Sequence, residues 1–266
     1  MLTAQILIVL SALAGIVYLA RKNPFMLKTT RVLAGLAMLA LFVWLMVEGR
    51  VLQSCPLSDA WGVLAMVGVI LIALSGWVSL RYKFPGVLTG VMALLAAAIV
   101  LGRIFFPPPG AAEIKISWML GLHILVASAG FSVLAIGCIS GILILVRTRV
   151  LKSVKWSTQS NTAWPSLTAL DRVFTLSLEL GVILLTLGVA LGVLFAPGAG
   201  LQGVWYLDPK VITSALGLGL YALVFALRRK RGFFSWPIVA AATLGFVFVL
   251  LGFFLSNYFT VGFHRF

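Results

Sequence analysis

Hydrophobic positions along this chain gather into long runs, and polar positions gather in the segments between them. Eight such runs occur, at residues 3–20, 32–47, 61–80, 86–106, 117–146, 173–195, 211–227 and 236–259. About 20 apolar residues cross a bilayer as an α-helix, so the pattern predicts eight transmembrane helices. The runs lack the two-residue alternation of membrane barrel strands, which favours an all-α, polytopic helical bundle.

Composition indicates the same class of protein. Hydrophobic residues make up 62% of the chain and charged residues 10%, and the mean hydropathy is +1.16. These values are typical of integral membrane proteins and exclude a water-soluble globular domain. Because little chain lies between the runs, we expect a single transmembrane domain over residues 1–266.

The basic residues predict the orientation of the helices. By the positive-inside rule, the loops that carry most Lys and Arg are cytoplasmic, so both termini are predicted to be external. The first run follows no basic segment and precedes no clear cleavage site, and we interpret it as a retained helix. This topology explains the net charge of +14, so no nucleic-acid partner is needed to account for it. A basic cytoplasmic face also attracts anionic lipid. Fifteen of the 20 basic residues lie in the predicted cytoplasmic loops, namely Arg21, Lys22, Lys28, Arg31, Arg81, Lys83, Arg147, Arg149, Lys152, Lys155, Arg172, Arg228, Arg229, Lys230 and Arg231.

The two histidines and one unusual loop fall at the external face in this topology. His123 lies near the start of the fifth run, and His264 follows the eighth run. The sequence GVWYLDPK, at residues 203–210, lies in the loop between the sixth and seventh runs. This convergence suggests one site that is built from three separate segments.

Haem is the metal cofactor that best suits two histidines. Zinc sites take three or four protein ligands, and the cysteines do not complete such a set. Cys55 lies in an external loop, whereas Cys138 lies about 22 Å from His123 at 1.5 Å per helical residue. Haem needs only one or two axial ligands from the protein, so His123 and His264 are candidate iron ligands.

A haem at this face also needs apolar walls and cations for its propionates. Trp118, Trp205 and Tyr206 are candidate walls. The basic residues at the same predicted level are Lys115, Lys210 and Arg265.

Simpler interpretations of these residues remain open. Trp and Tyr are common at membrane interfaces whatever the function, and each histidine can be an interfacial polar residue. Asp208 and Pro209 form a suitable N-cap and first residue for the seventh helix, and Lys210 can extend its side chain to the interface. Glu179, inside the sixth run, can face a wet cavity or pair with Arg172 or a hydroxyl.

Glycines in the fifth and sixth runs predict close packing of two helices. Small residues on one stripe of each helix let the backbones approach. The two sets share one spacing, and they are Gly130, Gly137 and Gly141 in the fifth run and Gly181, Gly188 and Gly192 in the sixth.

The order of these features resembles that of the CcsA/ResC and CcmC group of haem-handling proteins for cytochrome c assembly. The stretch WYLDPKV stands where the family has a W-x-W-D-P-K-E type motif in a tryptophan-rich external loop, which we place at about 196–210. SWMLGLHILVASAGF is similar to the helix of the family's first external histidine, and SNYFTVGFHRF to the segment of its second. GRVLQSCPLSDAW resembles an upstream G-x-x-P-L-S-N segment. Within the loop Leu207 and Val211 differ from the family's pattern, whereas Trp205, Asp208, Pro209 and Lys210 match it.

The resemblance implies a bacterial inner-membrane protein that holds or presents haem b at the external face during cytochrome c maturation. His123 and His264 would be the axial ligands, Trp205 and Tyr206 the platform, and Asp208 and Lys210 the residues that shape the loop. The implied partners are haem, apocytochrome c and a ResB-type subunit with a periplasmic domain, and the complex would be a cytochrome c haem lyase. Two alternatives stay open, a HemX-like regulator of haem biosynthesis and a small-molecule transporter.

Overall fold

The predicted helical bundle is confirmed. The computed structural model describes residues 1–21, 23–51, 56–82, 85–106, 118–152, 166–198, 209–231 and 236–255, and within these ranges all regular secondary structure is helical. Within the described ranges, eight helices are long and apolar enough to cross a membrane. They are α1 (Leu2–Arg21), α2 (Pro24–Val51), α3 (Ala60–Arg81), α4 (Pro85–Phe105), α5 (Trp118–Lys152), α6 (Leu167–Gly198), α7 (Pro209–Arg231) and α8 (Trp236–Leu255), with a short 3-10 helix, η1 (Pro56–Ser58), before α3.

Several helices extend beyond the apolar runs that predicted them. Helix α2 begins at Pro24 rather than at residue 32, and α6 begins at Leu167 rather than at residue 173. Apolar composition marks only the part of a helix that lies in hydrocarbon, whereas the helix itself continues until a cap or a proline ends it. Pro24 supplies such a boundary, because proline suits the first position of a helix. The predicted end of the eighth run, residues 256–259, lies outside the described residues.

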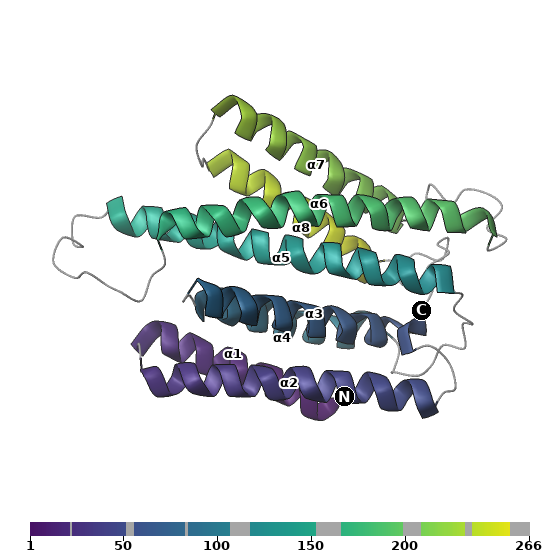
Figure 1. Ribbon diagram of the computed structural model, residues 1–266, viewed down its shortest axis with the longest axis horizontal. Coiled ribbons are helices and arrows are strands. Elements are labelled where there is room, and N and C mark those ends of the chain that lie inside the picture. Colours follow the sequence, from purple (N-terminus) through teal and green to yellow (C-terminus); the bar gives the residue numbers. More distant parts are fainter. Residues whose placement is uncertain are drawn as a thin grey trace.

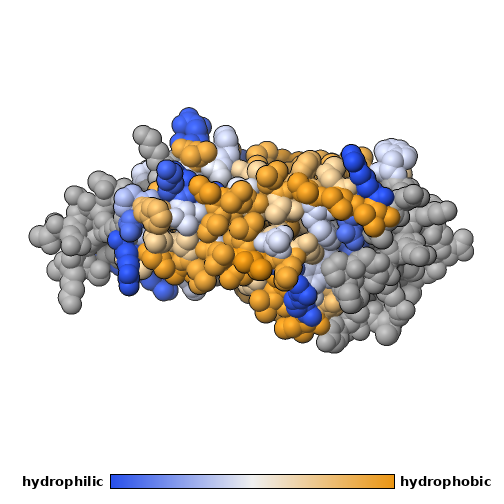
Figure 2. Space-filling view, turned by 90° about the horizontal axis from the view of Figure 1, so that it is seen from below, coloured by the Kyte–Doolittle hydropathy of each residue, from blue (hydrophilic) through white to orange (hydrophobic). Residues whose placement is uncertain are grey.

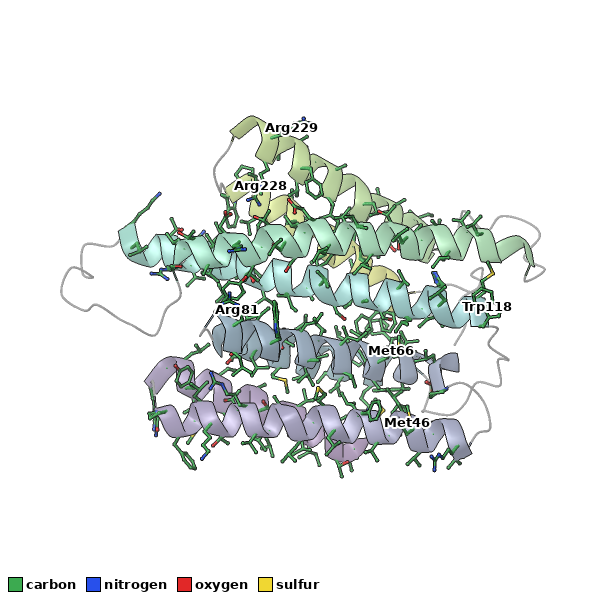
Figure 3. All side chains as sticks on the ribbon, viewed as in Figure 1. Met46, Met66, Arg81, Trp118, Arg228 and Arg229 are labelled. Carbon is green, nitrogen blue, oxygen red and sulfur yellow. The ribbon has the colours of Figure 1, made fainter. Side chains whose placement is uncertain are left out.

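The helices form layers that follow the chain. Helices α1 and α2 lie side by side, α3 and α4 form the next layer, and α5 and α6 follow. Helix α7 lies beyond α6, and α8 passes behind the α5–α6 pair and packs against α7 and α5 (Figure 1). We call the end where α5 begins the Trp118 end and the opposite end the Arg81 end, after residues labelled in Figure 3. Figure 2 shows apolar residues across the middle of the face in view and hydrophilic residues toward both ends, the distribution expected of a protein that spans a bilayer.

The core consists of apolar residues from most of the helices. Leu71, Met92, Leu134, Phe174 and Tyr221 are among the largest fully buried side chains. Many leucines outside this core are exposed, and Leu194 is 68% exposed. An exposed apolar surface of this kind is suited to contact with lipid. The buried side chains of this protein are therefore those packed between helices, and their burial does not measure removal from water.

The prediction of close packing between α5 and α6 is confirmed. A Cβ atom built on Gly130 would lie 2.6 Å from the backbone nitrogen of Leu185, and one built on Gly188 would lie 2.9 Å from the Cα atom of Ala127. These glycines therefore permit a backbone approach that alanine would block. The result is a tightly joined helix pair that positions His123.

Candidate functional site

His123 lies in the second turn of α5, at the Trp118 end of the bundle. Its side chain is half-buried against α6. The ring nitrogen Nδ1 lies 2.7 Å from the main-chain carbonyl oxygen of Gly188. Because a carbonyl can only accept a hydrogen bond, Nδ1 donates and therefore carries a proton.

Gly192, one turn further along α6, lies directly against the same ring. A Cβ atom built there would be 2.8 Å from Cε1 of His123 and 3.1 Å from its Nδ1. Real Cβ atoms do not make contacts as short as 2.8 Å. The absence of a side chain at Gly192 is therefore what makes room for the imidazole in this orientation.

Of the other residues predicted for the site, Trp118 is described: it is the first residue of α5, and its side chain is 78% exposed. Trp205, Tyr206, Asp208 and His264 lie outside the described residues. Lys210 is in the first turn of α7, and its side chain also lies outside what is described. Helix α7 begins at Pro209, as the sequence predicts for a proline at the first helical position.

An aromatic cluster that the sequence analysis did not predict lies at the Trp118 end. It joins α3, the end of α4 and the end of α8, where the ring of Phe106 stacks on that of Phe254 with centroids 5.3 Å apart. Phe106 also contacts Trp61 edge to face, at 6.1 Å. The signal in the sequence is a pair of adjacent phenylalanines at the end of the fourth apolar run and another near the end of the eighth. The cluster consists of Trp61, Phe105, Phe106, Phe253 and Phe254.

Arg103 connects this cluster to the first helix. Its Nη2 donates a hydrogen bond of 2.6 Å to Oε1 of Gln5, which is buried in α1. Its guanidinium carbon lies 5.5 Å from the centroid of the Trp61 ring, a cation–π geometry. Arg103, one of the few basic residues predicted to be external, thus fastens α1, α3 and α4 together.

Glu179 lies at a different place, in a groove between α6 and α7 toward the Arg81 end. The groove has a volume of about 320 Å³, and Arg228 and Arg229 form part of its wall. Arg228 forms an ion pair with Asp171 at 3.4 Å. Among the described residues Glu179 makes no ion pair with Arg172, one of the two kinds of partner that the sequence suggests for it. Glu179 is therefore no part of the site at the Trp118 end.

Cys138 lies about 22 Å along α5 from His123, at 1.5 Å per helical residue. It is buried in α5, where its Sγ lies 3.7 Å from Oγ1 of Thr243 on α8. Cys55, its only counterpart in the chain, lies outside the described residues. No group of three or more His, Cys, Asp or Glu residues within the described ranges is placed to hold a metal ion.

Comparison with known protein families identifies the family of membrane proteins to which the chain belongs. The family described as "Cytochrome C assembly protein" matches residues 2–264. The chain belongs to this family. Membership places it among the multi-pass membrane proteins of cytochrome c maturation, whose work concerns haem and apocytochrome c. No curated protein matches the sequence of the chain.

Proposed function

We propose that this cytochrome c assembly protein binds haem b at the external face of the bacterial inner membrane and presents it for cytochrome c maturation. His123 and His264 are the axial ligands, and Trp205 and Tyr206 form a platform beside the haem. Asp208 and Lys210 shape the loop before α7. The observation that carries the proposal is the orientation of His123 on α5.

The imidazole of His123 fits the role of an axial ligand. Since its Nδ1 donates to the Gly188 carbonyl, the neutral imidazole carries its lone pair on Nε2. Iron binds the unprotonated nitrogen of a neutral imidazole, and metal-ligating histidines commonly donate their other N–H to a carbonyl. Two further observations support the proposal, the family match over residues 2–264 and the position of His123 near a helix end.

The length of the chain after α8 supports His264 as the second ligand. Leu255, the last residue of α8, precedes His264 by nine residues. An extended chain of that length reaches about 30 Å at most, so His264 stays within reach of the Trp118 end. The aromatic cluster fixes the end of α8 from which that segment starts.

In this proposal the protein supplies binding and orientation. Haem, when bound, contributes the vinyl groups that react with the thiols of an apocytochrome C-x-x-C-H motif. The imidazoles of His123 and His264 would bind the iron, and the chain would keep the haem at the external surface. A ResB-type subunit with a periplasmic domain is the proposed partner, and together the two would form the haem lyase.

The first experiment is the visible absorption spectrum of the detergent-purified protein, as isolated and after dithionite reduction. The parent is expected to show a Soret band and sharp α and β bands, the signature of haem with two histidine ligands. A variant with both His123→Ala and His264→Ala should lose these bands. Leu122→Ala, which changes the neighbouring half-exposed position on α5, is the matched control and should keep them.

Chemical rescue separates ligand loss from misfolding. In His123→Gly, added imidazole should restore the absorption bands, because free imidazole can occupy the vacated position. A parent protein that takes up no haem, even when haem is supplied, would overturn the proposal and direct attention to a regulatory function.

A further inference from the structure

We infer that Gly188 and Gly192 of α6 are positioning residues for His123: the Gly188 carbonyl holds the imidazole in one tautomer, and the missing side chain of Gly192 leaves the space in which the ring takes its direction. The inference rests on the proposed ligation of haem by His123. It assigns these two glycines a role in tuning the ligand, in addition to the role in helix packing that their spacing predicts.

The tautomer follows from the hydrogen bond. In a neutral imidazole only one of the two ring nitrogens carries a proton, and the nitrogen that faces a carbonyl must be that one. The distance of 2.7 Å between Nδ1 and the Gly188 oxygen is a short hydrogen bond. It holds His123 in the form whose Nε2 binds iron, and the donated hydrogen bond makes that nitrogen a stronger ligand.

The ring direction follows from the surroundings of Gly192. The three atoms nearest to a Cβ built there, at 2.8, 3.1 and 3.5 Å, all belong to the His123 ring. The other glycines of the α5–α6 interface differ in this respect. A Cβ on Gly181 would meet Leu134, and one on Gly130 would meet the backbone of Leu184 and Leu185.

This difference provides a matched pair of substitutions in one helix. Gly192→Ala pushes on the imidazole, which can rotate, so the change moves the ring more easily than the backbone. Gly181→Ala introduces the same methyl group at the same helix interface, but against Leu134. Damage to helix packing should appear in both variants, whereas an effect on His123 should appear only in the first.

The first test needs no haem. The chain has two histidines, so in a His264→Ala background His123 gives the only side-chain signals after labelling with ¹⁵N-histidine. We expect Nδ1 protonated and Nε2 unprotonated in that background and with Gly181→Ala added. Adding Gly192→Ala should instead give a mixture of tautomers. An Nε2-protonated ring, an imidazolium, or an identical spectrum in the Gly192→Ala variant would overturn the inference.

The second test uses the haem-loaded protein with both histidines. Loss of the hydrogen bond that a metal-ligating histidine donates through its other nitrogen typically costs about 10- to 100-fold in metal affinity. Gly192→Ala should therefore weaken haem binding by about that factor and change the midpoint potential and the electron paramagnetic resonance spectrum, which depends on the orientation of the imidazole planes. Gly181→Ala should leave the potential and the spectrum unchanged, and equal changes in both variants would contradict the inference.

The two tests distinguish failure of the inference from failure of the proposed function. If the parent binds no haem but His123 shows the expected tautomer and responds to Gly192→Ala, the proposed function fails and the positioning geometry stands. If the parent binds haem but His123 has the other tautomer, the inference fails alone.

Discussion

At the scale of single residues, the start of α3 shows how a short polar segment adopts one defined backbone conformation. The carboxylate of Asp59 accepts a hydrogen bond of 2.5 Å from the backbone nitrogen of Gly62 and so caps the helix. A Cβ on Gly62 would collide with the carbonyl oxygen of Pro56. The sequence PLSDAWG therefore folds into η1, a cap and the first turn of α3 in close succession.

Gly62→Ala should destabilise the protein by about 3 kcal/mol, at the upper end of the range for overpacking, because the opposing atom is backbone and cannot rotate away. The measurement is the free energy of unfolding from a titration of the detergent-solubilised protein with SDS. Gly76→Ala is the control in the same helix, since a Cβ there meets nothing within 4 Å. Equal stability of the two variants would contradict the proposed close approach.

At the scale of helices, the described ends of α4 and α8 meet through aromatic rings. Phe106 stacks on Phe254 and contacts Phe253 edge to face, both with centroids 5.3 Å apart. Lipid gives little hydrophobic driving force between helices, so ring packing of this kind must supply much of the attachment. In the proposed function this junction also fixes the starting point of the segment that carries His264.

Phe106→Ala should remove about 3 kcal/mol of stability through loss of packed ring area. Hydrogen exchange should accelerate in the last turns of α8 more than at the α5–α6 interface, because the junction is local. Ile104→Ala changes a 63% exposed residue of the same helix and serves as the control. Uniform acceleration across the bundle would show that the cluster supports the whole fold instead of the α8 end.

At the scale of the whole molecule, charge is distributed unevenly between the two ends. Arg81, Arg228 and Arg229 lie toward one end and Trp118 lies at the other (Figure 3). Among the described basic residues, Arg50 and Arg103 belong to helix ends on the Trp118 side. The positive-inside rule then predicts that the Trp118 end is external.

Thiol labelling tests this orientation. With Cys138→Ala as background, a membrane-impermeant maleimide should label Cys55 in intact cells, because its loop precedes α3 at the predicted external end. With Cys55→Ala and Lys152→Cys added instead, labelling should require permeabilised cells. The opposite pattern would invert the topology and place His123 on the cytoplasmic side, which would contradict the proposed presentation of haem outside.

The sequence predicted the fold well but only part of the candidate site. Eight helices and the close α5–α6 pairing follow from apolar runs and glycine spacing, which are local signals. The choice of His123 as a candidate also came from the sequence. Its contact with Gly188 joins residues 65 positions apart in the chain, and no periodic pattern within one helix indicates which ring nitrogen faces α6.

By itself, the sequence determined that this chain belongs in a lipid bilayer, how many segments are able to cross the bilayer, and which loops carry the positive charge. These properties depend on residue type and on spacing along one helix. Only the tertiary structure decided that Gly192 lies against His123, that phenylalanines from α4 and α8 stack, and that Glu179 lines a groove with Arg228 and Arg229. The reason is physical: these contacts depend on how helices rotate and approach one another, which is set by the packing of all the side chains between them.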